Sequence, residues 1–178
     1  YWGEGHPLYA APTVATGLTP SIIPNFDASA TLRVSPDPQL ASNSTATSLG
    51  AIGIAVSGAA IFNDSEGNGP LSGAIGSLDY AGGHIGPSEY HYHLEPIPFS
   101  DDDANLVGIM ADGFFIYGRK CNSVGTYPDD LDASGGHIST TQHTTDPEYH
   151  YHIINEFYIG SSILLFGGDY QGTPRSIN

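Results

Sequence analysis

The sequence predicts an all-β protein, and its composition and patterning support this. Among the 178 residues are 23 Gly and 13 Pro, but only four Lys and Arg together and a single Met. Such a composition suits short strands joined by turns better than long helices. Apolar runs are broken by turn residues, and no segment shows a convincing amphipathic helical period. We therefore expect two similar hairpin-containing units in one sandwich-like or barrel-like domain, with an extended N-terminal tail.

An internal repeat indicates how the chain is organised. Three blocks occur twice in the same order: IGIAVSGAAIF and VGIMADGFFIY (52–62 and 107–117), LDYAGGH and LDASGGH (78–84 and 131–137), and EYHYH (89–93 and 148–152). Matched blocks in a fixed order predict a duplication. We place the two units at about 52–93 and 107–152, within a β domain of residues 49–178. Residues 1–48 are rich in Pro, Ala and Thr and are read as an extended tail.

Each apolar block reads as a β-hairpin. Ser57-Gly58 and Asp112-Gly113 stand between two apolar runs. A residue pair such as Asp-Gly is a strong hairpin signal, because a two-residue turn of this kind needs positive φ at both positions. Asp112 is accordingly interpreted as a turn residue rather than a catalytic acid. The run SSILLFGGDY near the C-terminus predicts a further strand.

The EYHYH copies concentrate histidine on one strand face. Side chains alternate across a strand, so the Glu and both His of each copy share a face, while the two Tyr lie on the other. The His of each GGH block can return beside its pair. These positions predict a metal site: His84, His91, His93, His137, His150 and His152, and less certainly Glu89 and Glu148.

Histidine and carboxylate ligands suit zinc or copper best, whereas calcium prefers oxygen ligands alone and would bind at acidic loops such as residues 101–103. Asp79 and Asp132 are expected to support the rings from outside the coordination sphere. A structural alternative stays open: the imidazoles form a buried polar network with these carboxylates and with tyrosine hydroxyls. For the acidic loop, the favoured reading is a solvated surface.

The net charge of −15 argues against binding to nucleic acid, and no apolar run is long enough for membrane insertion. The single Cys121 excludes an internal disulfide framework, and we interpret it as inert. No nucleophile elbow, phosphate-binding loop or zinc-protease helix motif occurs. An enzyme is therefore the less favoured expectation.

The N-terminus suggests export and assembly. The chain begins with Tyr1 rather than Met, which is typical of a processed, secreted protein. Asn43 and Asn63 lie in N-glycosylation sequons. A Pro-rich segment cannot fold alone, yet residues 1 to about 25 carry apolar anchors such as Trp2 and Leu8. We expect this tail to pack on another copy by strand addition, which gives self-association in a ring or filament. The alternative is a tail folded over its own domain.

Several motifs together resemble the YHYH domain family. The paired YHYH motif, the GGH block and DGFFIYG at 112–118 carry the resemblance, which covers about residues 50–172. It implies export and supplies little about function. Family members often carry Cys in the D-x-C-x-G-H stretch, whereas residues 79–84 and 132–137 of this chain contain none, so any disulfide or thiol role there is absent.

Two functions therefore stand side by side. The favoured expectation is a secreted, extracellular structural protein that polymerises head-to-tail through its tail and carries histidine-rich sites. The alternative is a metal-dependent enzyme or a metal-binding module with its site between the two halves.

Overall fold

The computed structural model describes residues 30–86 and 89–178, and this part of the chain is all-β, as predicted. It contains no α-helix in these ranges, only short strands and two 3-10 turns. The elements are β1 Gly53–Ala55, β2 Ala60–Ile61, β3 Ser65–Glu66, β4 Gly69–Pro70, η1 Leu71–Gly73, η2 Ile75–Ser77, β5 Gly83–Ile85, β6 Tyr90–Tyr92, β7 Leu106–Met110, β8 Phe115–Tyr117, β9 Gly136–Ser139, β10 Glu148–His152, β11 Phe157–Ile159 and β12 Ser162–Ile163.

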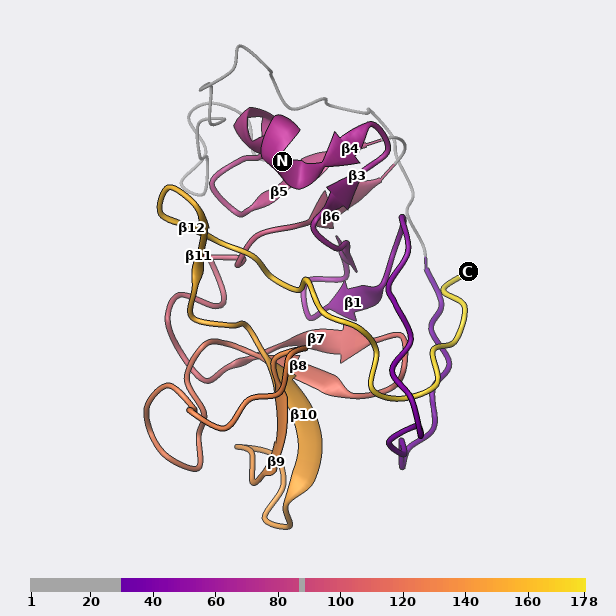
Figure 1. The fold of residues 1–178 in the computed structure, drawn as a ribbon, viewed down its shortest axis with the longest axis vertical. Helices are drawn as coiled ribbons and strands as arrows, with labels where there is room; N and C mark the ends of the chain where they lie inside the picture. Colours follow the sequence, from indigo (N-terminus) through magenta and orange to yellow (C-terminus); the bar gives the residue numbers. More distant parts are fainter. Residues whose placement is uncertain (1–29, 87–88) are drawn as a thin grey trace.

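Eight strands form one mixed sheet whose order is β5-β6-β2-β1-β7-β8-β10-β9. β1 and β7 pair antiparallel at its centre, and from this pair the order outward is equivalent on both sides: hairpin partner, parallel strand, edge strand. The strands of the first half lie toward the top of Figure 1 and those of the second half toward the bottom. This order is what a duplication would give, although a common origin of the halves stays a prediction.

Both predicted hairpins are present, but their turns differ from the expected type. β1–β2 turns at Ser57-Gly58 and β7–β8 at Asp112-Gly113. The amide of Gly58 donates to the carbonyl of Ala55, and the amide of Ala55 donates to the carbonyl of Ala59. Only the glycines have positive φ, +87° and +97°. Each loop thus has three residues, a turn followed by a left-handed glycine, and the expectation of positive φ at both turn positions was wrong.

Asp112 has a structural role at its turn, as expected. Its buried carboxylate accepts hydrogen bonds from the Tyr151 hydroxyl at 2.6 Å and the Gly172 amide at 3.0 Å. The turn is thereby fastened to β10 and to the C-terminal segment. These residues border the main core, which packs one face of the sheet and includes Ile52, Val107, Met110, Ile116, Tyr151, Ile153, Leu165 and Phe166.

The segment from residue 30 to residue 48 lies along the C-terminal segment of the same chain. Leu32 forms a bridge with Ile177, and Thr45 forms one with Tyr170. In Figure 1 the two segments run side by side at the right. This part of the predicted tail is therefore docked on its own domain. The tail of residues 1 to about 25, on which the assembly prediction depends, lies outside the described residues.

The C-terminal strand prediction is confirmed only in part. Of the run SSILLFGGDY, Ser162–Ile163 form β12, which pairs with β11, and Leu164 forms a bridge with Leu94. Among the described residues, no helix has the length and apolar character that crossing a membrane would require.

Candidate metal centres

The first half contains one tight group of potential metal ligands, which we call the first centre: Glu66, His84, His91 and His93. The Nε2 atom of His91 lies 3.0 Å from the Nε2 atoms of both His84 and His93. Oε1 of Glu66 lies 3.0 and 3.1 Å from the same two outer rings. All three imidazoles are buried, and the Glu66 side chain is 24% exposed.

The strand pairing explains why the three histidines meet. His84 on β5 stands directly opposite His91 on β6, and His93 follows on the same face two residues later. The amide of His93 donates to the carbonyl of Gly82, where a Cβ would lie 2.9 Å from the backbone oxygen of Leu94. The glycines before His84 therefore permit the close approach that was predicted for the GGH block.

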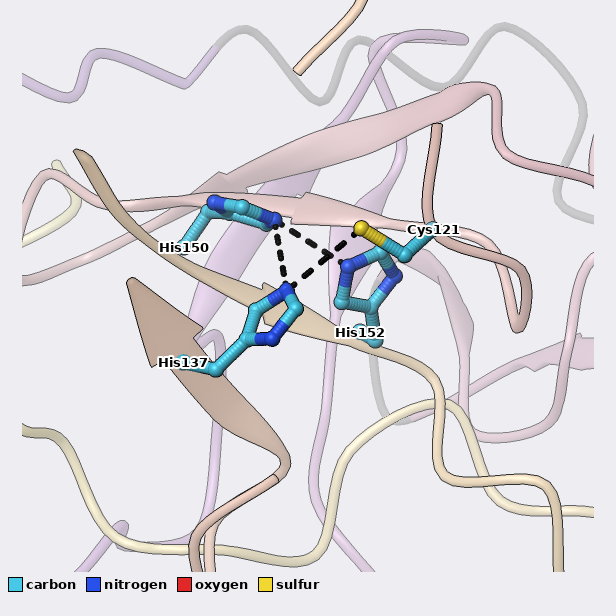
Figure 2. A group of neighbouring side chains, drawn as sticks. All are labelled: Cys121, His137, His150 and His152. Atoms are coloured by element: carbon cyan, nitrogen blue, oxygen red, sulfur yellow. Dashed lines mark hydrogen bonds between the residues drawn. The ribbon is translucent and has the colours of Figure 1, made fainter. Parts of the chain in front are cut away.

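The second half contains the equivalent group, which we call the second centre: Cys121, His137, His150 and His152. Figure 2 shows the four side chains pointing toward one another. Nε2 of His150 lies 3.2 Å from that of His137 and 3.1 Å from that of His152. Sγ of Cys121 lies 3.6 Å from Nε2 of His137. All four residues are buried.

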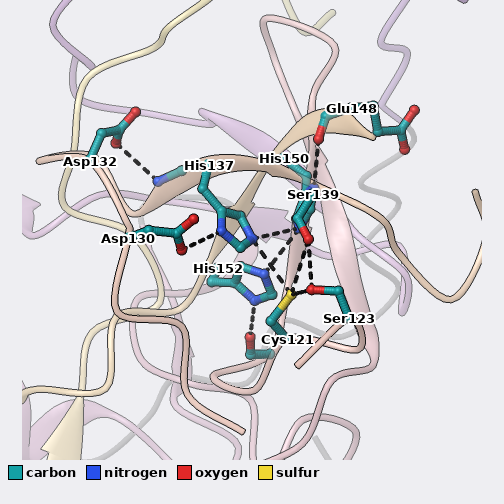
Figure 3. A network of polar contacts seen from close by, with 11 residues as sticks. Cys121, Ser123, Asp130, Asp132, His137, Ser139, Glu148, His150 and His152 are labelled. Atoms are coloured by element: carbon teal, nitrogen blue, oxygen red, sulfur yellow. Dashed lines mark hydrogen bonds and ion pairs between the residues drawn. The ribbon is translucent and has the colours of Figure 1, made fainter. Parts of the chain in front are cut away.

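A hydrogen bond at Nδ1 fixes each ring. In four rings Nδ1 lies beside a backbone carbonyl, which can only accept a hydrogen bond. Nδ1 of His91 lies 3.2 Å from the carbonyl oxygen of Glu89, and Nδ1 of His150 lies 3.0 Å from that of Glu148. Nδ1 of His93 lies 2.6 Å from the carbonyl oxygen of Asn63, and Nδ1 of His152 lies 2.7 Å from that of Gly118. Figure 3 shows these contacts around the second centre. These rings must carry the proton on Nδ1, so Nε2 of each neutral ring presents a lone pair to the middle of its centre.

The remaining two rings have the same orientation. Nδ1 of His137 donates to the carboxylate of Asp130 at 2.7 Å. Nδ1 of His84 lies 2.7 Å from the hydroxyl of Ser77, which itself donates to the carbonyl of Ala74 and so accepts from the ring. In both centres, therefore, three Nε2 lone pairs converge.

Burial favours the neutral form of five of the six rings. Desolvation lowers the pKa of His91 to about 3, helped by the neighbouring His93 and His84. Desolvation also lowers the pKa of His150 and His152 to about 4, although the hydrogen bonds from these rings to backbone carbonyls act in the opposite direction. The pKa values of His84 and His93 are also lowered by burial. Protonation of these rings is thus an unfavourable way to satisfy the converging lone pairs.

The donor spacing fits a four-coordinate metal ion. Nitrogen ligands at about 2.05 Å in a tetrahedron lie about 3.3 Å apart, and a thiolate at about 2.3 Å lies about 3.6 Å from each nitrogen. The observed separations of 3.0–3.2 Å and 3.6 Å are close to these values. Oε1 of Glu66 is buried and accepts no hydrogen bond within the described residues. Both groups are therefore compatible with a bound metal ion.

The structure brings together all six predicted histidines, three in each centre, but not the predicted glutamates. Glu89 and Glu148 contact the centres through their carbonyls, and the Glu148 carboxylate accepts from Thr144 instead. Asp79 and Asp132 bond the hydroxyls of Tyr90 and Tyr149 and nearby backbone amides, not the rings. They hold the strand pairs rather than the imidazoles.

The fourth donors, Glu66 and Cys121, were missed. Each lies four residues beyond the end of the gapless repeat, at Phe62 and Tyr117, and so at equivalent positions. Extending that alignment would have paired a carboxylate with a thiol, both known metal ligands. Cys121 was read as inert because it was considered alone.

Two further sequence predictions fit the structure poorly. Asn63 is buried, and its side-chain nitrogen donates to Thr47 and to the carbonyl of Ser48, so a glycan there would replace one of the two donated hydrogens and would not fit the buried position. Asn43 is exposed.

In the acidic triplet proposed for calcium, Asp102 pairs with Arg119 at 3.3 Å and Lys120 at 3.1 Å. These cations offset the charge of Asp102, the middle carboxylate of the triplet.

Comparison with known proteins bears on the family. No curated protein and no solved structure matches the chain. The family model described as YHYH protein matches residues 31–129, more than half of the chain. The match begins earlier than the resemblance suggested and ends before the second EYHYH copy. It includes the whole first centre and Cys121. The chain belongs to the YHYH protein family.

Proposed function

We propose that this protein binds two transition-metal ions, one at each centre, and that these ions stabilise its fold. The observation that supports this most is the convergence of three Nε2 lone pairs in each centre, at separations of 3.0–3.2 Å. Neutral rings with fixed Nδ1 protons repel one another at this distance, and a cation in the middle turns repulsion into coordination.

The donor set points to zinc or copper. Imidazole suits both metals, and the thiolate of Cys121 adds a soft ligand. Because each centre has four protein donors, it resembles closed structural sites more than catalytic ones, which keep an open position. A structural role also suits a chain with strands of two to five residues and no disulfide among the described residues. Each group of donors lies within one half of the chain, so the proposed ions would be bound within the halves rather than between them.

Elemental analysis of purified protein tests this proposal. We expect two equivalents of zinc or copper per chain, and one equivalent after His91→Asn or His150→Asn, each of which removes a central ligand. His143→Asn is the matched control, since this histidine belongs to neither centre. A metal-free protein that takes up no added zinc or copper would refute the proposal.

Self-association is a second candidate function. Within the described residues, β5 and β9 each pair with one neighbour only, so each leaves an open edge. Ile138 on β9 is 60% exposed and lines a groove with Pro36, Pro38 and Phe115. An open edge beside exposed apolar side chains is suited to strand addition. Such an edge supports the sequence-based proposal of tail-mediated assembly, and secretion stays a separate proposal from the sequence.

Particle size before and after deletion of residues 1–25 tests the assembly proposal. We expect the full chain to form large particles at high concentration and the truncated chain to stay small. Ile138→Lys should have the same effect if β9 is the receiving edge. A monomeric full chain, or equal assembly of the truncated chain, would contradict it.

A further inference from the structure

We infer that the two centres differ in metal exchange: the first centre takes up and releases its ion readily, whereas the second centre retains its ion. This inference rests on the two-metal function proposed above and assigns a different role to each site.

The fourth donors differ in how firmly the chain holds them. Glu66 lies on the β3–β4 hairpin, whose strands pair only with each other among the described elements. Its side chain is 24% exposed. Cys121 is fully buried, and its amide donates to Thr126 while its carbonyl accepts from Gly125. A partly exposed ligand leaves more easily than a fully buried one.

The donor chemistry differs in the same direction. A thiolate binds zinc and copper more strongly than a carboxylate does. The hydroxyl of Ser139 donates to Ser123, which leaves Ser123 to donate to Sγ of Cys121 at 3.1 Å and thus to support a thiolate. An anionic partner makes a metal-bound imidazole a stronger ligand. His137 has the carboxylate of Asp130, whereas His84 has only the hydroxyl of Ser77.

Displacement of Glu66 would open one position on the first ion. Three buried imidazoles would remain, which is the number of protein ligands found in catalytic sites where a fourth position admits water or a small anion. The first centre is therefore the site at which chelators, incoming metal and small anionic ligands reach an ion in this protein. In the second centre all four donor residues are buried.

Cobalt(II) distinguishes the centres, because only the second centre can show thiolate-to-cobalt charge-transfer absorption. The full chain is loaded with two equivalents of cobalt and then challenged with EDTA. We expect one equivalent to leave first with the charge-transfer band unchanged. The second should leave at least about tenfold more slowly, together with the band. Loss of both ions at one rate, or earlier loss of the band, would overturn the inference.

Two variants assign the phases. Glu66→Gln keeps the size of the side chain and should accelerate the first phase alone. Cys121→Ser should abolish the band and accelerate the second phase alone. Failure of the full chain to bind any cobalt or zinc would refute the proposed function itself, whereas two bound ions of equal lability would refute only the inequality. Two phases that neither variant changes would also overturn the assignment.

Discussion

The orientation of each histidine depends on one hydrogen bond at Nδ1. Backbone carbonyls provide it for four rings, whereas His137 uses the side chain of Asp130 at 2.7 Å. That hydrogen bond from His137 is also the main cause that lowers the pKa of Asp130. A carboxylate in this position both fixes the tautomer and increases the donor strength of the ring. Asp130 is therefore the orienting group most accessible to mutation.

Asp130→Asn should weaken metal binding at the second centre by about tenfold, because an amide can still accept from Nδ1 but carries no charge. Asp129→Asn is the matched control, since its carboxylate is also exposed and belongs to neither centre. Competition against a chromophoric zinc chelator measures the affinity. Equal affinities for the two variants would mean that the Asp130 charge does not act on the ion.

The residues of the site were predictable to the extent that they repeat. All six histidines follow from the EYHYH and GGH blocks, because strand alternation places ligands two residues apart on one face. Glu89 satisfies the same alternation, yet its carbonyl rather than its carboxylate contacts the centre. Glu66 and Cys121 come from a hairpin and a turn, whose return to the sheet depends on tertiary packing. Only their equivalent position in the repeat could have indicated them.

At the scale of elements, β5 with β6 and β9 with β10 each carry a set of buried rings. In the metal-free protein, burial lowers the pKa of five of them, His84, His91, His93, His150 and His152, whereas in the unfolded chain histidine titrates near pH 6.5. The unfolded chain therefore binds more protons than the folded one at mildly acidic pH. The contribution of these rings to stability is most favourable above about pH 6.5, and it falls as the pH falls toward about 4, the pKa of His150 and His152 in the folded state.

Thermal unfolding in the presence of EDTA, at pH values from 7.5 down to 4.5, checks this expectation. His91→Asn should make the dependence shallower, because it removes the ring whose pKa burial lowers to about 3. His143→Asn serves as the control outside the centres. A melting temperature that stays constant over this range would show that the rings are not held neutral.

The elements themselves were only partly visible in the sequence. Both hairpins were predicted from the turn residues that interrupt apolar runs. The parallel pairing of β2 with β6 and of β8 with β10 was not, because strands far apart in the chain pair through tertiary contacts that leave no local pattern. Strands such as Ala60–Ile61 are also too short to show a period of their own.

For the whole molecule, the two centres lie toward opposite ends of one sheet. β6 and β10 are separated by β2, β1, β7 and β8. Five steps between neighbouring strands, at about 4.8 Å each, place the centres about 24 Å apart along the sheet. Each ion would therefore fasten one edge of the sheet, and neither would share a ligand with the other.

Loss of the two ions should accordingly be additive in the free energy of unfolding. His91→Asn removes the central ligand of the first centre and His150→Asn that of the second. Sites more than about 10 Å apart without shared partners add within about 0.5 kcal/mol. Urea denaturation of the two single variants and the double variant, each with zinc at one fixed free concentration, gives the coupling energy. Among the described residues, no side chain joins the two centres directly. A coupling energy above about 1 kcal/mol would therefore contradict additivity, and would mean that the two halves fold as a single unit through the β1–β7 pair.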